Sequence, residues 1–168
     1  MSQRLLPVLV SKQAQMTLDS TSVLVGVVST AVALSVGYLL GKGKRGRHVV
    51  PGNALFAAGQ SYGNFVFVSG QLGLAAGSPP KLVDGGVQAQ ARAAFTHMKR
   101  ILEESGSSMA NVLKCECLLN DIKDYAAFNE VYNEFFTDPQ TKPARLCFAP
   151  GGLPLGGLVE VQAIAYRG

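Results

Sequence analysis

Between Val87 and Glu104, apolar residues recur at helical spacing, while charged and amide side chains fill the opposite face. This repeat predicts an amphipathic helix that ends at Ser105-Gly106. A second helix is expected from Asp124, whose side chain can cap the first turn, to a stop at Asp138-Pro139. Each helix must bury its apolar face against other elements, so the remaining apolar segments decide the fold class.

Four short segments rich in β-branched, aromatic and other apolar residues predict strands. They cover residues 65–70, 112–119, 144–148 and 158–166. The order strand, helix, strand, helix, strand, strand predicts an α+β fold with a mixed sheet and both helices on one face. The strands are apolar at nearly every position, so both sheet faces should be buried. Because two helices cover only one face, we expect further copies of the chain to cover the other.

The first 50 residues differ in character from the rest of the chain. Residues 20–41 contain no charged side chain, and at about 1.5 Å per residue a helix of this length spans a bilayer. The basic cluster 42–47 follows, and the positive-inside rule then places residues 51–168 on the cytoplasmic side. We therefore expect residues 1–50 to form a single-pass membrane anchor. A cleaved signal peptide, a mitochondrial presequence and a buried helix are the alternatives, so a cytosolic or mitochondrial location stays open.

The formal net charge of +4 is unevenly distributed along the chain. Residues 51–168 contain nine basic and ten acidic side chains, so the basic excess belongs to residues 1–50. A domain with a net charge of −1 has no electrostatic excess for binding nucleic-acid phosphates. No nucleic-acid partner is expected.

The three cysteines, Cys115, Cys117 and Cys147, form neither an even set nor a regularly spaced one. This pattern argues against a disulfide framework and fits a reducing compartment. Cys115 and Cys117 have no second cysteine pair and no histidine nearby in sequence, so no metal site is expected. Two apolar positions on one face of a strand explain the pair.

Two charged residues stand inside the apolar strand segments near the C-terminus. Arg145 lies in segment 144–148, and Glu160 lies in segment 158–166. A charge is costly to bury unless it has a partner or a use. On neighbouring strands, this guanidinium and this carboxylate would form a small site that binds an anionic ligand and activates water. A purely structural ion pair between the two residues is the alternative.

Five pieces of the sequence, by their order and spacing, resemble the RidA family of reactive-intermediate deaminases, also called the YjgF family. The pieces are GNFVFVSGQ at 63–71, QAQAR at 88–92, FNEVYNEFF at 128–136, PARLC at 143–147 and VEVQAIA at 159–165. The resemblance runs from about Asn53 to Tyr166. It implies the chorismate mutase-like fold and a homotrimer with three clefts between subunits.

The resemblance also implies an activity, the hydrolysis of 2-imino acids such as 2-iminobutanoate and 2-iminopropanoate to 2-oxo acids and ammonia, with no cofactor. Arg145 would bind the substrate carboxylate through two parallel hydrogen bonds. Glu160 would position and polarise the attacking water. Other positions match those that line the family's cleft. They are Ser69, Gly70, Asn129 and Cys147.

One cleft position departs from the family pattern. Where the family typically has a tyrosine, this chain has Phe56, which keeps the aromatic wall but lacks the hydroxyl. We expect lower activity or a more apolar substrate preference. The first alternative function is therefore a non-catalytic protein that binds small carboxylates. The second is the translation-inhibiting ribonuclease activity ascribed to some relatives, which the charge of the domain disfavours.

Overall fold

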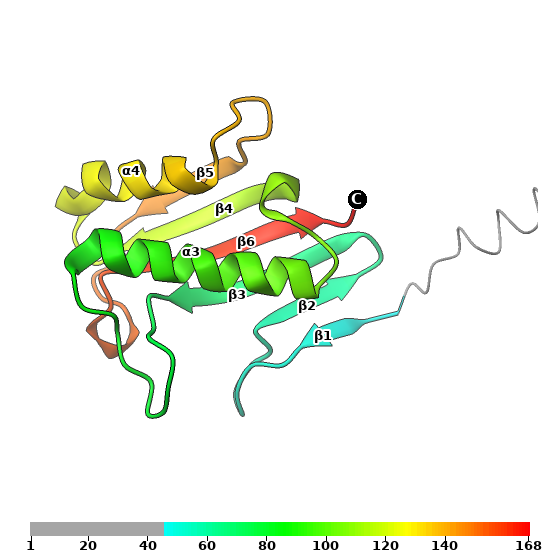
Figure 1. Ribbon diagram of the computed structural model, residues 1–168, viewed down its shortest axis with the longest axis horizontal. Helices are drawn as coiled ribbons and strands as arrows, with labels where there is room; N and C mark the ends of the chain where they lie inside the picture. The colour runs from blue at the N-terminus through cyan, green and yellow to red at the C-terminus, as the bar shows by residue number, and fades with distance from the viewer. Residues whose placement is uncertain (1–45) are drawn as a thin grey trace, which may run out of the picture. The chain divides into compact units, whose positions relative to one another are not determined.

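In the computed structural model, which describes residues 46–168, segments with alternating burial pair into one six-stranded sheet (Figure 1). The strands are β1 (His48–Val50), β2 (Gly59–Tyr62), β3 (Phe65–Leu72), β4 (Val112–Leu119), β5 (Ala144–Phe148) and β6 (Val159–Tyr166). Three short 3₁₀ turns accompany them, η1 (Met109–Asn111), η2 (Ile122–Asp124) and η3 (Pro154–Gly156). The four expected strands are confirmed, and β1 and β2 extend the sheet beyond them.

The strand order is β1-β2-β3-β6-β4-β5. β4 and β5 run parallel, whereas every other neighbouring pair is antiparallel. The last strand of the chain, β6, is inserted between β3 and β4 and so lies in the middle of the sheet (Figure 1). The parallel pair needs a crossover connection, and the second helix supplies it.

The two helices are α3 (Gly86–Glu104) and α4 (Tyr125–Phe135). Both lie over the same face of the sheet, as expected from the sequence (Figure 1). The start of α4 differs in one detail from the expectation. Asp124 occupies the N-cap position, but its side chain accepts no capping hydrogen bond.

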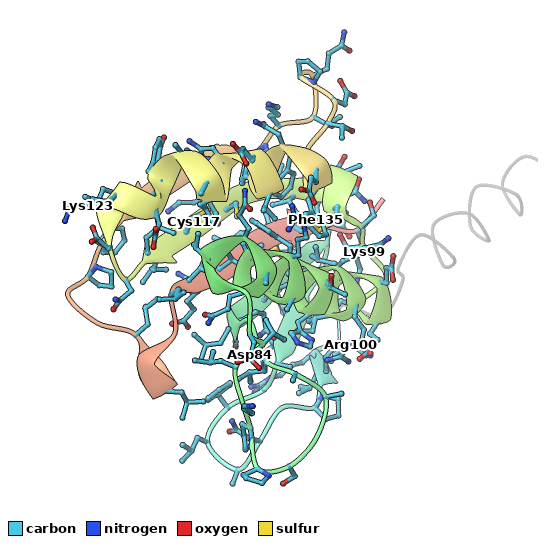
Figure 2. The ribbon with its side chains drawn as sticks, turned by 60° about the vertical axis from the view of Figure 1, so that its left-hand side comes forward. Asp84, Lys99, Arg100, Cys117, Lys123 and Phe135 are labelled. Carbon is cyan, nitrogen blue, oxygen red and sulfur yellow. The ribbon has the colours of Figure 1, made fainter. Side chains whose placement is uncertain are left out.

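The hydrophobic core lies between the helices and the sheet. Alternate residues of the central strands supply its floor. They are Val66, Val68, Cys115, Cys117, Leu119, Val159, Val161, Ala163 and Ala165. Phe95 of α3 packs against aromatic rings on and after α4, among them Phe128 and Phe135. In Figure 2, Cys117 lies behind the helices, on the sheet, whereas Lys99 and Arg100 lie toward the outer side of α3.

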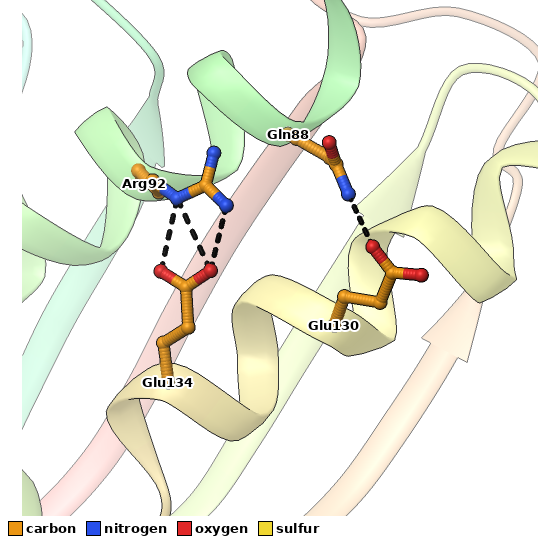
Figure 3. Close-up of polar contacts among 4 residues, drawn as sticks. All are labelled: Gln88, Arg92, Glu130 and Glu134. Carbon is orange, nitrogen blue, oxygen red and sulfur yellow. Dashed lines mark hydrogen bonds and ion pairs between the residues drawn. The ribbon is translucent and has the colours of Figure 1, made fainter.

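Polar side chains on the outer surface link the two helices (Figure 3). Arg92 donates three hydrogen bonds to the carboxylate of Glu134, two from Nε at 2.9 and 3.2 Å and one from Nη2 at 2.6 Å. One turn earlier on each helix, Gln88 donates to Glu130 at 2.5 Å. The two pairs are solvent-exposed and contribute little to stability. They are surface contacts between the helices, separate from the side chains that contact Arg145.

The sheet face opposite the helices, here called the open face, carries large apolar side chains that are 40% to 53% exposed. They are Phe65, Phe67, Leu146, Phe148 and Tyr166. An exposed apolar patch on this scale marks an interaction surface. The expectation that further copies of the chain cover this face stays a prediction.

The fold class expected from the sequence needs one correction. It joined an N-terminal transmembrane helix to the α+β domain, and the fold that the structure supports is the α+β domain with its mixed sheet and two helices. Across residues 46–168, no helix is both long enough and apolar enough to cross a membrane. The expected span at 20–41 lies outside the residues that the structure describes.

Candidate functional site

Arg145 lies on the edge strand β5, and its side chain points to the helix-covered side of the sheet. Its Nη1 donates to Asn129 Oδ1 at 2.7 Å, and its Nη2 donates to the Tyr125 hydroxyl at 2.6 Å. The guanidinium carbon lies 4.6 Å from the centre of the Tyr132 ring, a cation–π contact. Neutral groups alone therefore orient this cation, and no ion pair within residues 46–168 includes it.

The sequence of α4 explains why these three side chains meet Arg145. Tyr125, Asn129 and Tyr132 are spaced four and three residues apart, which places them on one face of a helix. The crossover from β4 to β5 sets that face over β5. Tyr125 was not singled out from the sequence. The signal that could have found it is a polar group one turn before Asn129.

Cys147 follows Arg145 on the same side of β5 and pairs in register with Cys117 of β4. The Sγ atoms of Cys115 and Cys117 lie 3.6 Å apart in the core. Burial, and then the proximity of Cys117, raises the pKa of the half-buried Cys147 thiol. A thiol with a raised pKa is protonated at neutral pH and is a weak nucleophile. This environment suits a residue that lines a pocket.

Glu160 lies on β6 between Val159 and Val161, both fully buried under the helices. Strand alternation therefore places the Glu160 side chain on the open face. Burial raises the pKa of its carboxyl group. Gly70 of β3 leaves the space that this carboxylate occupies, because a Cβ at Gly70 would overlap it.

Ser69 and Gly70 lie where β3 shifts its register against β6, between Val68 and Gln71. Such a bulge redirects side chains locally. The Ser69 hydroxyl donates to the Ala57 carbonyl oxygen at 2.7 Å, which ties the bulge to the segment that carries Phe56. Phe56 is 51% exposed.

A hollow of about 300 Å³ opens beside this bulge on the open face. Its lining includes Ser69, the ion pair between Lys114 and Glu116, and Gln162, whose amide donates to Glu116. Lys114 lowers the pKa of Glu116 through a hydrogen bond, and Gln162 does so to a lesser extent. The hollow therefore has a polar floor within an otherwise apolar face.

The seven residues predicted for the site fall into two groups. The arginine half-site consists of Arg145, Asn129 and Cys147, together with Tyr125 and Tyr132. The glutamate half-site consists of Glu160, Ser69, Gly70 and Phe56.

The expectation that Arg145 and Glu160 lie on neighbouring strands is wrong. β4 lies between β5 and β6, and the two side chains point to opposite faces of the sheet. The structural ion pair considered above is therefore also absent from the described part of the chain. Within one chain, the sheet itself separates the guanidinium from the carboxylate.

No group of three or more His, Cys, Asp or Glu side chains in the region 46–168 is arranged to hold a metal ion. The arginine half-site can bind an anion, and the glutamate half-site can exchange a proton with water.

Comparison with known proteins gives a consistent family. The family model described as Endoribonuclease L-PSP matches residues 48–167. A goat (Capra hircus) protein named 2-iminobutanoate/2-iminopropanoate deaminase is 42% identical over 103 residues, which cover 61% of this chain and 73% of the relative. The mitochondrial protein MMF1 of Saccharomyces cerevisiae is 37% identical over 117 residues, which cover 70% and 78%.

Solved structures agree with the sequence relatives. The crystal structure of E. coli TdcF with bound serine has a TM-score of 0.64 and 31% identity, and the match covers 71% of this chain and 94% of that one. The family match therefore spans the whole α+β domain, including β1 and both half-sites. The chain belongs to the Endoribonuclease L-PSP family, the family of RidA and YjgF proteins that its motifs resemble.

Proposed function

We propose that this protein hydrolyses 2-imino acids to 2-oxo acids and ammonia, at a site that two copies of the chain build together. One copy supplies the arginine half-site, and its neighbour supplies the glutamate half-site. The substrates proposed are small imines such as 2-iminobutanoate and 2-iminopropanoate.

The observation that carries the proposal is the state of Arg145. Two neutral acceptors and an aromatic ring hold its guanidinium in place, and no carboxylate within residues 46–168 neutralises it. A guanidinium has five N–H donors, and the described residues 46–168 engage two of them. The others remain for a ligand carboxylate, which such a planar fork binds bidentately.

Glu160 has the properties of the group that handles the proton. Its pKa is raised toward neutral pH, and a general base works best when its pKa lies near the operating pH. The carboxylate takes a proton from water as the water oxygen adds to the iminium carbon. Glu160 then returns this proton to the carbinolamine nitrogen, which leaves as ammonia, and the carboxylate takes the proton of the remaining hydroxyl as the 2-oxo acid forms.

The relatives support both the reaction and the ligand type. The goat relative is named for the deamination of two small 2-imino acids, and TdcF was crystallised with serine, which also carries a carboxylate. The mitochondrial assignment of the yeast relative supports a mitochondrial location. Imaging of the full-length chain with a C-terminal fluorescent tag tests that location.

Association in which the β5 edge of one copy meets the open face of its neighbour would bring the two half-sites together, because Arg145 lies on that edge strand and Glu160 on the open face. The exposed apolar side chains of that face favour burial against another copy. We expect three copies in the assembly. Light scattering on the purified protein measures the mass, and a stable monomer would remove the shared site.

The reaction is tested by generating 2-iminobutanoate in the assay with an amino-acid lyase and following its loss against buffer. The expected result is faster loss with the wild-type chain and no acceleration with Arg145→Ala. An assembled protein that binds 2-oxobutanoate without accelerating hydrolysis would favour the carboxylate-binding alternative, for which Phe56 is the supporting residue.

A further inference from the structure

We propose that the Tyr125 hydroxyl is a positioning residue for Arg145, which orients the guanidinium for carboxylate binding. This inference rests on the proposed function for the identity of the substrate. It goes beyond that function by assigning a role to a residue that neither the family motifs nor the sequence pattern identified.

The contact between the two side chains is short and direct. The Tyr125 oxygen accepts from Arg145 Nη2 at 2.6 Å, and the Tyr125 side chain is 41% exposed. A hydrogen bond from a charged donor is stronger than one between neutral groups. It also leaves the guanidinium its full charge, because the phenol is neutral.

Tyr125 and Asn129 act on different ends of the same guanidinium. Asn129 accepts from Nη1 and Tyr125 accepts from Nη2, and both acceptors project from consecutive turns of α4. The Tyr132 ring lies against one face of the group. Two fixed ends and one covered face define the plane of the guanidinium, so its unused N–H donors point in set directions.

Without the hydroxyl, only Asn129 and the ring faces would hold the guanidinium. The guanidinium plane could then rotate about the Cδ–Nε bond. A bidentate ligand would have to restore its orientation on binding. That ordering cost falls on the bound state. The aromatic ring at position 125 is retained in Tyr125→Phe, so its cation–π contact with Arg145, at 5.3 Å, is kept.

The effect should appear in binding more than in turnover. Once a substrate is bound, its own carboxylate holds the guanidinium, and the chemistry at Glu160 proceeds as before. We therefore expect Tyr125→Phe to raise KM, and the Kd for 2-oxobutanoate, by about tenfold. The change in kcat should stay within about twofold, as for loss of a contact that serves binding alone.

The test compares Tyr125→Phe with Tyr62→Phe in the full-length chain. Tyr62 lies on β2, is 65% exposed and loses the same hydroxyl in the control. Calorimetric titration with 2-oxobutanoate gives Kd, the imine assay gives KM and kcat, and thermal unfolding checks that each variant is folded. Weaker binding in Tyr125→Phe alone, with kcat preserved, supports the proposal.

Other outcomes separate this inference from the proposed function. Unchanged Kd and KM in Tyr125→Phe would overturn the positioning role while leaving the deaminase intact. A wild-type chain that binds 2-oxobutanoate in a Tyr125-dependent way but hydrolyses no imine would overturn only the proposed reaction. Equal losses in Tyr125→Phe and Tyr62→Phe would point to a general effect on the fold and would also refute the positioning role.

Discussion

Contacts within one chain organise the arginine half-site, whereas the glutamate half-site lies on the open face of the sheet. Arg145 is held by two hydrogen bonds and an aromatic ring, all from α4. Glu160 has a raised pKa and accepts no hydrogen bond from any residue between 46 and 168, and it lies on the open face.

The difference follows from which sheet face each strand presents. Arg145 on β5 points to the side of the sheet that α4 covers. Glu160 on β6 points to the open face, which nothing in the described chain covers. A cation placed among neutral acceptors can bind an anion without help from another copy. Under the proposed function, the Glu160 carboxylate would gain its substrate and its surroundings when another copy covers the open face.

Arg145→Ala should give the largest loss, because it removes the charge on which the arginine half-site depends. Two charge-assisted hydrogen bonds to the substrate carboxylate disappear, so kcat/KM should fall at least about 100-fold. The matched control is Arg92→Ala, which removes an exposed arginine that pairs with Glu134 on the outside of the helices. Activity retained in Arg145→Ala, measured by the imine assay, would contradict the assignment of the anion site.

Glu160→Gln should separate the two half-sites by affecting turnover and sparing binding. General acid–base catalysis contributes about 100- to 10,000-fold, so kcat should fall by at least about 100-fold. The Kd for 2-oxobutanoate should change little, since Arg145 is untouched. Glu103→Gln, on the exposed side of α3, is the control. Binding lost together with turnover would mean that Glu160 supports the assembly and not the reaction.

The same variant carries a pH prediction with a definite sign. Because the pKa of Glu160 is raised in the folded protein, the folded state binds more protons than the unfolded state between the two pKa values. Stability therefore falls as pH rises through that window. Glu160→Gln should unfold at a higher temperature than wild type at pH 7, and the gain should vanish below the usual pKa of a glutamate. A gain that is independent of pH would rule out desolvation of the carboxylate as its cause.

Phe67→Glu tests whether the glutamate half-site depends on a covered open face. The substitution places a charge among exposed aromatic residues, and burying an unpaired charge opposes association. At low protein concentration, activity should fall by at least about tenfold as the assembly dissociates. Light scattering should show the smaller mass. Carboxylate binding at Arg145 should weaken less than turnover, because contacts within one chain organise the arginine half-site.

The local structure was predictable from the sequence to a large extent. The helix expected from Val87 to Glu104 begins one residue earlier, at Gly86, and the strands at 112–119 and 144–148 have the expected bounds. Their apolar residues recur at regular spacing, so these elements can be predicted from local sequence alone. β1 and β2 escaped notice because segments such as Gly59–Tyr62 lack an apolar repeat. Their strand structure comes from pairing with β3.

The arrangement of the site was less predictable because it depends on strand order. The types of residue at Arg145 and Glu160 marked them as unusual, but local patterns do not say that β6 enters between β3 and β4. Because β4 therefore lies between β5 and β6, Arg145 and Glu160 are not on neighbouring strands and belong to separate half-sites. Tyr125 was missed for a similar reason, since its partner Arg145 lies 20 residues away in the chain.

Cys147→Ala should give the smallest effect and would sharpen the account of the arginine half-site. Burial and the nearby Cys117 raise the pKa of the Cys147 thiol, so little thiolate exists at neutral pH. If the thiol only lines the pocket, kcat/KM should stay within about fivefold of wild type, the cost of a small packing change. The pH profile of activity should also be unchanged, because the proposed function assigns the titrating group to Glu160. Two results would contradict this account. They are a loss as large as that of Arg145→Ala, and a covalent adduct on Cys147 seen by mass spectrometry during turnover. Either would indicate that Cys147 acts as a nucleophile and that the arginine half-site does more than bind an anion.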